Sequence, residues 1–223
     1  MSLKSPTLSH PWSLTPQDAA ALQRQLAPRV LRQSSIDVEK IKTVAGVDTH
    51  YRDGLASAAV VVVSIQNLET VDWVTSSERV NFPYVPGLLT FREGPAVVAA
   101  LTKLTSQPDL LIFDGQGIAH PRRFGIASHI GLLLDRPSIG CAKSRLVGHH
   151  KEPGREKGKY TFLEDRDEAI GAVLRTRSDV KPVYVSIGHR IDLIDSIRII
   201  LKCCRRYRLP EPIRRADRLA RKI

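Results

Sequence analysis

The sequence predicts an α/β protein whose mixed sheet has three antiparallel strands followed by parallel strands, with helices flanking the sheet. Three β-rich segments, residues 43–51, 57–66 and 70–81, follow one another across short polar turns, which is typical of an antiparallel meander. Helical and apolar segments then alternate, and strands joined by helical crossovers run parallel. A chain of 223 residues has room for one sizeable core, so we expect a single domain over residues 1–223.

The first helix follows a polar lead. Residues 1–14 contain several prolines and polar side chains, and we expect them to form a flexible N-terminal lead. Thr15 offers an N-cap hydroxyl, Pro16 suits the first helical position, and Asp18 places an acid in the first turn. Apolar residues then recur at helical spacing, so a helix is expected over residues 16–33.

Helical and strand-like segments alternate beyond residue 90. The pattern predicts a helix over 91–106 with Glu93 in its first turn, a buried strand over 110–113, a helix over 125–134, a strand over 137–142, a helix over 166–176, a strand over 182–187 and a helix over 192–206. The remaining C-terminal segment is rich in arginine. Its charges suit either the backbone of a nucleic acid or a solvated helix face.

The composition limits the classes of function. A formal net charge of +11 favours a polyanionic partner, most often nucleic acid. The three cysteines, Cys141, Cys203 and Cys204, form no CxxC pair and no even set, which argues against a zinc ribbon or a disulfide scaffold. The sequence has no leader-like start and no apolar run long enough for a bilayer, so we expect a cytoplasmic protein without a membrane partner.

Three acids predict a metal site. Asp48 lies within the first strand, Glu93 at the start of a helix, and Asp114 directly after the buried strand. If a right-handed crossover brings that strand beside the first, Asp48 and Asp114 become neighbours and Glu93 faces them. Clustered carboxylates repel one another unless cations neutralise them, and Mg²⁺, with Mn²⁺ as a substitute, prefers such oxygens. Two such ions support phosphodiester hydrolysis, although capping of the next helix is the simpler role for Asp114.

Five blocks of sequence carry a resemblance to a known family. They read VAGVDTHY, FPYVPGLLTFRE, DLLIFDGQGIAHPRRFGIASHIGLLLDRPSIGCAKSRL, SIGHR and YRLPEPIRRAD, and together they span most of the chain from Ile41 to Asp217. On these blocks the chain resembles the endonuclease V family of deaminated-base repair nucleases, which have a ribonuclease H-like core. The resemblance implies that Asp48, Glu93 and Asp114 bind the catalytic metal ions.

The resemblance also implies the reaction and the substrate. The expected partner is DNA containing deoxyinosine or other deaminated bases. The expected reaction hydrolyses the second phosphodiester bond on the 3′ side of the lesion and leaves a 3′-hydroxyl and a 5′-phosphate. A monomer is expected, because such an enzyme must track a duplex.

Tyr84 is a candidate wedge. Pro83 and Pro86 fix the backbone around it, so the ring loses little entropy on stacking into a duplex beside an extruded nucleotide. Packing of the ring against its own loop is the alternative. An extruded base needs a pocket that reads its edge, and the backbone near glycines can do so. The candidate lining residues are Gly87, Leu88, Gly115, Gly117, Ile118 and His120, with ordinary turn geometry as the alternative for the glycines.

Several cations accompany these acids. Lys143 follows the strand 137–142 and suits contact with the scissile phosphate, as the resemblance also implies, but an exposed strand-end lysine is the simpler reading. His120 is a candidate for proton transfer or phosphate contact, with a structural hydrogen bond equally compatible. Arg122, Arg123 and His189 are further candidates for phosphate contacts.

Other functions remain compatible with the sequence. An endoribonuclease specific for inosine in RNA would use the same site, because no motif visibly reads the 2′-hydroxyl. A basic binding module with structural acids would cut nothing. A strand-transfer enzyme of similar core would need additional DNA-binding regions, for which the chain has little room.

Overall fold

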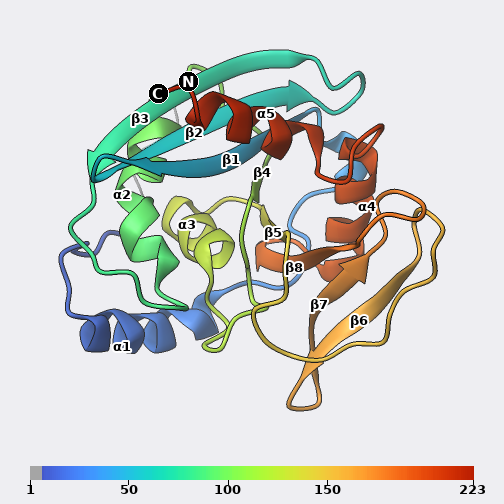
Figure 1. Ribbon diagram of the computed structural model, residues 1–223, viewed down its shortest axis with the longest axis horizontal. Coiled ribbons are helices and arrows are strands. Elements are labelled where there is room, and N and C mark those ends of the chain that lie inside the picture. Colours follow the sequence, from blue (N-terminus) through green and yellow to red (C-terminus); the bar gives the residue numbers. More distant parts are fainter. Residues whose placement is uncertain (1–6) are drawn as a thin grey trace.

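The computed structural model describes residues 7–223, and the strands of this part of the chain form one mixed sheet (Figure 1). The strands are β1 (Thr43–Arg52), β2 (Leu55–Ser64), β3 (Thr70–Arg79), β4 (Leu110–Phe113), β5 (Ser138–Ala142), β6 (Tyr160–Asp165), β7 (Glu168–Leu174) and β8 (Val183–His189). Their order across the sheet is β3-β2-β1-β4-β5-β8-β7-β6. Strands β1, β4 and β5 run parallel, whereas β2, β3, β6, β7 and β8 pair antiparallel with their neighbours, so the predicted mixed sheet is confirmed.

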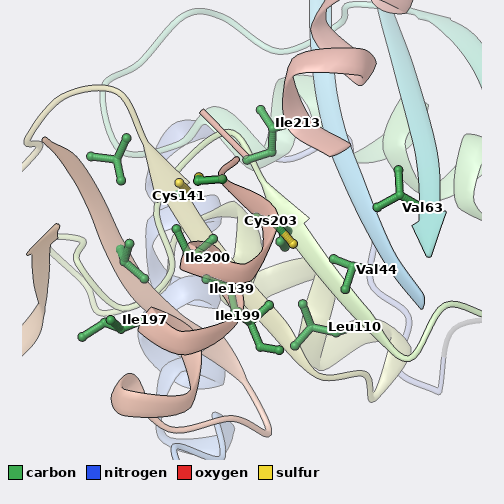
Figure 2. Packing of buried hydrophobic residues seen from close by; sticks show 14 of the residues in the cluster. Val44, Val63, Leu110, Ile139, Cys141, Ile197, Ile199, Ile200, Cys203 and Ile213 are labelled. Atoms are coloured by element: carbon green, nitrogen blue, oxygen red, sulfur yellow. The ribbon is translucent and has the colours of Figure 1, made fainter. Parts of the chain in front are cut away.

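Helices cover both faces of this sheet (Figure 1). They are α1 (Pro16–Leu26), α2 (Leu89–Leu101), α3 (Ile126–Leu134), α4 (Leu193–Cys203) and α5 (Glu211–Ala220). Buried side chains of α2 and α3 pack with Val47, Val60 and Phe113 on one face. Those of α4 and α5 pack with Val44, Leu110 and their neighbours on the other, as Figure 2 shows. None of the helices within residues 7–223 is both long and apolar enough to cross a membrane.

The β1–β2 hairpin forms where its turn sequence predicts it. Asp53 and Gly54 both adopt positive φ angles, 49° and 76°, which is the backbone that a tight hairpin turn requires and that Asp-Gly accepts readily. The β2 strand is rich in valine and alanine and is buried along nearly its whole length. This hairpin fixes the position of β1, which carries Asp48.

Two predicted helices differ from the structure. The helix expected over 16–33 ends at Leu26 and continues as a short 3₁₀ turn, Ala27–Arg29, because Pro28 lacks the amide hydrogen for another turn. The helix expected over 166–176 is wrong, since these residues lie mainly in β7, and its partner β6 was missed. Alanine and leucine in this stretch favour a helix, but pairing of β7 with β8 and burial in the core override that local preference.

The N-terminal lead is more ordered than the sequence suggests. Residues 1–6 lie outside the described part of the chain, but residues 7–14 pack against α2 and α3. The Thr7 amide donates a hydrogen bond to the Leu133 carbonyl, and the ring nitrogens Nε2 of His10 and His129 lie 2.7 Å apart. Residues 7–14 therefore make specific contacts that the sequence alone did not predict.

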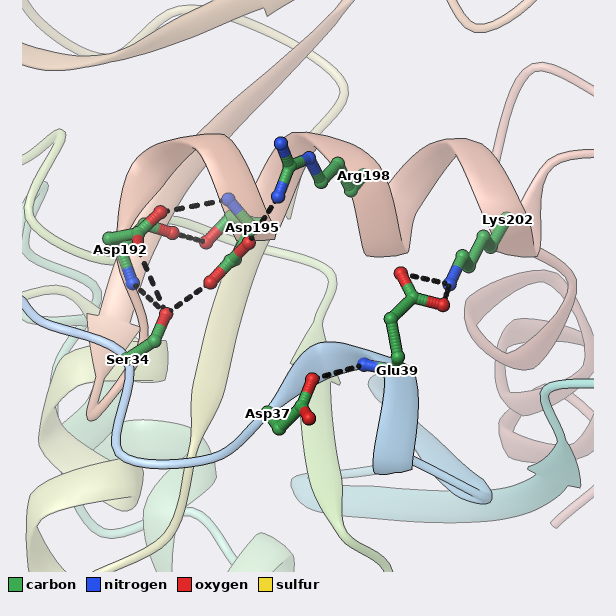
Figure 3. A network of polar contacts seen from close by, with 8 residues as sticks. Ser34, Asp37, Glu39, Asp192, Asp195, Arg198 and Lys202 are labelled. Atoms are coloured by element: carbon green, nitrogen blue, oxygen red, sulfur yellow. Dashed lines mark hydrogen bonds and ion pairs between the residues drawn. The ribbon is translucent and has the colours of Figure 1, made fainter.

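Helix α4 begins with a local capping network (Figure 3). The Asp192 carboxylate accepts a hydrogen bond from the Asp195 amide, and the Ser34 hydroxyl donates to both carboxylates. This agrees with the capping role that the residue types favour. Helix α5, in contrast, lies within the arginine-rich segment for which the sequence predicted no definite helix.

Candidate active site

Two aspartates emerge side by side from the centre of the sheet. Strands β1 and β4 pair in parallel as far as Val47 and Phe113, and the Asp114 amide donates a 3.1 Å hydrogen bond to the Val47 carbonyl. Asp48 and Asp114 are the next residues on the two strands. The predicted adjacency of these acids is therefore confirmed, and it follows from the parallel register.

Glu93 approaches the same place from α2. The helix begins at Leu89, so Glu93 lies in its second turn and not in the first turn as predicted. Its side chain is buried, and the Tyr51 hydroxyl donates a 3.1 Å hydrogen bond to Oε1 of Glu93. Tyr51 belongs to β1 and had not been singled out from the sequence. The residue that orients this carboxylate thus comes from the strand that also carries Asp48.

Lys143 completes a charged pair with Asp114. Because β5 runs parallel to β4, the residue after β5 reaches the same edge of the sheet as Asp114. The ammonium group of Lys143 forms an ion pair with Oδ2 of Asp114. Burial of the ammonium group opposes its charge, but the hydrogen bond to Asp114 raises the pKa of Lys143 overall. A cation is therefore held beside the two aspartates.

A fourth acid, Asp217, reaches the site from α5. Desolvation opposes its ionisation, but a hydrogen bond from Arg221 outweighs this, and a hydrogen bond from the Asp48 carboxyl also helps to lower the pKa of Asp217. Helix α5 can come so close because Gly46 has no side chain: a Cβ there would lie 2.1 Å from the carbonyl carbon of Pro212. Asp217 had not been singled out from the sequence as a site residue.

A sequence signal for Asp217 does exist. A proline at the start of the segment and buried Ile213, Ala216 and Ala220 at helical spacing mark a helix with one apolar face. Applied to this segment, that pattern places Asp217 one residue from the buried face. What the sequence cannot show is that the face docks on β1 beside Asp48.

The acids resist ionisation in this arrangement. Desolvation and then the neighbouring charge of Asp114 raise the pKa of Asp48 to about 7. Desolvation raises the pKa of Glu93 to about 8, against the hydrogen bond from Tyr51, and the charges of Asp48 and Asp114 add to the rise. Each value reflects first the burial that disfavours the charged form, and then the negative charge of the neighbouring acids.

This donor set suits a magnesium-like cation. Within residues 7–223 no three acid, histidine or cysteine side chains converge closely enough to form a ready-made metal cage. Mg²⁺ does not need one, because it is usually held by one or two carboxylates together with waters and substrate phosphates. Asp48 and Asp114 provide such carboxylates, and a bound cation would remove the repulsion that raises their neighbours' pKa values.

A pocket of about 340 Å³ opens beside Asp114 and Lys143. Tyr84 stands at its wall with 73% of its surface exposed, so the alternative that its ring packs into its own loop does not describe the structure. The Arg92 guanidinium lies 6.0 Å from the Tyr84 ring centroid and 4.9 Å from that of Tyr51. This arginine therefore bridges the exposed ring and the residue that holds Glu93.

Three of the six residues predicted to line the pocket lie in its wall. Gly87, Gly115 and His120 lie in its wall, together with Gln116 and Arg145, which had not been singled out. The other three predicted residues lie elsewhere.

Packing explains the position of those three. Leu88 and Ile118 are buried in apolar clusters behind the wall. Gly117 lies against β8, where a Cβ would come within 1.9 Å of the Ile187 carbonyl oxygen. The ordinary structural role left open for the glycines thus describes Gly117.

His120 is held as a neutral ring. Burial, partly offset by the hydrogen bond to the Gly87 carbonyl, lowers the pKa of His120 to about 4, and the nearby arginines lower it further. Nε2 donates to the Gly87 carbonyl at 2.8 Å, so Nδ1 accepts from the Arg122 amide at 3.1 Å. Both ring nitrogens are occupied, which favours the structural hydrogen bond over proton transfer.

Two of the remaining candidates for phosphate contacts, Arg122 and Arg123, bind other groups of the protein. Arg122 donates to the Gly87 carbonyl and to Gln23, and Arg123 forms ion pairs with Asp165 and Glu168.

His189 lies at the wrong end of the sheet for the predicted contact. It pairs with the first residue of β5, whereas Lys143 follows the last, so the two are at opposite ends of that strand. The expected approach of His189 to the carboxylates is wrong, because β8 runs antiparallel to β5.

Comparison with known proteins gives a consistent result. The model of the Endonuclease V family matches residues 24–218. An endonuclease V from Roseiflexus sp. is 51% identical over 214 residues, which is 96% of either chain. The crystal structure of endonuclease V from Streptomyces avermitilis covers 100% of this chain with 97% of its own, with a TM-score of 0.90 and 41% identity. An endonuclease V from Ciona intestinalis, in complex with DNA containing an inosine, has a TM-score of 0.80 and 28% identity and covers 94% of this chain with 98% of its own.

Proposed function

The chain belongs to the endonuclease V family and is a nuclease that hydrolyses phosphodiester bonds, and from that premise we propose that it repairs DNA at deaminated bases, chiefly deoxyinosine. The cut falls at the second phosphodiester bond on the 3′ side of the lesion and leaves a 3′-hydroxyl and a 5′-phosphate. One observation carries this proposal: the carboxylates of Asp48 and Asp114 lie beside a base-sized pocket with an exposed tyrosine in its wall.

The chemistry is assigned to the acids and to Lys143. Asp48 and Asp114 would hold a divalent cation, Mg²⁺ or Mn²⁺, with Asp217 close to Asp48. When bound, such a cation would supply Lewis-acid chemistry, lowering the pKa of water and neutralising charge on the phosphate. Glu93, oriented by Tyr51, would contribute a third carboxylate to that cation. Lys143 exchanges its pairing with Asp114 for contact with the scissile phosphate, where charge develops.

Recognition is assigned to Tyr84 and the pocket. The exposed ring of Tyr84 stacks into the space that the extruded nucleotide leaves, because an aromatic ring held by prolines pays little entropy for that contact. A volume of about 340 Å³ suits one extruded base. Gly87, Gly115 and the neutral ring of His120 form the wall that meets its edge.

A cleavage assay tests this function. End-labelled DNA and RNA oligonucleotides that carry one inosine are incubated with Mg²⁺ or with EDTA, and Asp48→Asn serves as the inactive control. We expect a nick one nucleotide beyond the inosine in DNA, lost in EDTA and in the variant. Faster cleavage of the RNA would indicate that inosine-containing RNA is the substrate. If neither the DNA nor the RNA is cleaved, the proposal is contradicted.

A further inference from the structure

A second depression, of about 450 Å³, lies on the other side of the loop that carries His120. Five arginines and one glutamate line it: Arg24, Arg32, Arg122, Arg123, Arg166 and Glu168. They come from α1 and the segment that follows it, from the 120–123 loop and from the β6–β7 turn. Figure 1 shows α1 and that turn along the same lower edge of the molecule. Ion pairs of Arg32 and Arg123 with Glu168 hold these segments together.

The depression contains more arginines than carboxylates that pair with them. Arg32 and Arg123 are balanced by Glu168 and Asp165, whereas Arg122 is bound to a carbonyl and an amide that carry no net charge. Within residues 7–223, the side chains of Arg24 and Arg166 form no hydrogen bond or ion pair, and both residues are exposed. The charge of Arg24 also helps, after burial, to lower the pKa of Arg122, a sign of repulsion between them. An anion would relieve this repulsion.

The backbone that presents Arg166 is unusual. Arg166 and Asp167 have φ angles of 53° and 61° at the tip of the β6–β7 hairpin, where asparagine and glycine are the residues that fit with least strain. Arg123 has a φ of 55° on the facing loop. Long charged side chains at left-handed positions are costly and tend to occur where a site needs them.

The depression adjoins the pocket beside the carboxylates. The Gly87 carbonyl accepts hydrogen bonds from His120, which lines that pocket, and from Arg122, which lines the depression. The loop from Asp114 to Arg123 therefore runs from the acids, along the wall of the pocket, to the arginines. A nucleic acid strand with its scissile phosphate at the acids and an extruded base in the pocket would continue toward the arginines.

We propose that this arginine-lined depression binds backbone phosphates of the cleaved strand on the 5′ side of the extruded nucleotide, with Arg24 and Arg166 as the free contacts. The assignment of the 5′ side rests on the proposed function, since cleavage on the 3′ side of the lesion places the acids in the other direction. Phosphate contacts of this kind position a strand without reading its sequence.

The test measures binding without cleavage. The double variant Arg24→Ala/Arg166→Ala and the wild type are titrated, in EDTA, with labelled DNA carrying one inosine and with unmodified DNA. On strands with a long 5′ arm we expect the variant to bind roughly tenfold more weakly than the wild type. The slope of log K against log salt concentration should become less steep by about 1.5 to 2. On strands that begin with inosine the two proteins should bind equally.

The control variant is Arg198→Ala, which removes an exposed guanidinium from α4, outside the depression (Figure 3). It should bind every strand as the wild type does. Equal binding by the double variant on long 5′ arms, or a loss that persists when the 5′ arm is removed, would overturn the proposal. Competition by inorganic phosphate without any effect of the 5′ arm would show a free-anion site and would overturn it as well.

Failure of the phosphate-binding proposal can be distinguished from failure of the proposed function. If the wild type cuts no inosine substrate, the proposed function fails in the cleavage assay. The loss of affinity of the double variant for unmodified DNA, measured in EDTA, does not depend on that assay. If cleavage is normal and the 5′ arm has no effect, the assignment of the depression fails by itself.

Discussion

Two regions of this protein concentrate charge of one sign, and they handle it differently. Glu93 is buried and Asp48 is partly buried, and this burial, with repulsion from neighbouring acids added to it, raises their pKa values to about 8 and about 7. Most arginines of the second depression are exposed, and two of them pair with Glu168 and Asp165, so solvent and two carboxylates moderate their repulsion. Burial therefore decides whether a charged cluster needs a tightly held counterion or attracts a polyanion in a salt-sensitive way.

The largest effect is expected for Asp48→Asn. The amide keeps the shape of the side chain but removes a carboxylate that would hold the cation, so single-turnover cleavage should fall by roughly a hundredfold to a thousandfold. The double variant Arg24→Ala/Arg166→Ala should cleave at nearly the wild-type rate once the enzyme is saturated with DNA. A comparable loss of cleavage rate in both variants would contradict the different roles assigned to the two regions.

The pH dependence of stability should show the buried acids directly. Without metal, Asp48 and Glu93 retain protons in the folded state at pH values where they ionise in the unfolded chain. The folded state then binds more protons from about pH 4 up to about pH 8, so the free energy of unfolding falls as the pH rises through that window. Between about pH 6.5 and 8.5 we expect the melting temperature to drop by roughly 5 °C.

Two controls isolate this effect. Asp48→Asn should show a smaller drop over the same range, because one of the two titrating carboxyls is gone. Added Mg²⁺ should raise the melting temperature of the wild type more at the upper pH than at the lower, since it binds the ionised acids. A melting temperature that rises with pH in the metal-free wild type would contradict the buried-acid description.

Tyr51→Phe should weaken the cation site without removing it. The variant loses the hydrogen bond to Glu93 but keeps the ring that packs beneath Arg92. We expect the Mg²⁺ concentration for half-maximal cleavage to rise by roughly three- to tenfold, as the loss of one hydrogen bond of ordinary net strength implies. Metal binding measured by calorimetry should weaken in parallel, while DNA binding in EDTA stays unchanged; an unchanged Mg²⁺ dependence would show that Tyr51 does not orient Glu93.

The smallest effect is expected for Glu168→Gln. This change frees Arg32 and Arg123 from their shared carboxylate, so DNA binding in EDTA should tighten by roughly two- to threefold. Thermal stability should change little, because exposed ion pairs contribute at most about 1 kcal/mol. Glu164→Gln, on the same hairpin but outside the depression, is the matched control, and equal tightening in both variants would point to net charge instead of the depression.

Local patterns in the sequence were enough for much of the fold. The Asp-Gly turn, the valine-rich β2 and the buried run of β4 are short-range signals, and the structure contains the hairpin and both strands. Where tertiary pairing competes with local preference, the sequence misled, as in β7, where residues typical of a helix pair with β8.

The sequence by itself determined the residues of the central site that lie next to regular strands. Asp48, Asp114 and Lys143 follow from strand positions and one parallel crossover, because chain direction fixes which strand ends meet. Only the tertiary structure decided the rest. Asp217 joins the acids because α5 docks on Gly46, and His189 lies away from them because β8 runs antiparallel to β5. Docking of distant segments depends on packing between surfaces far apart in the chain, which local sequence patterns do not encode.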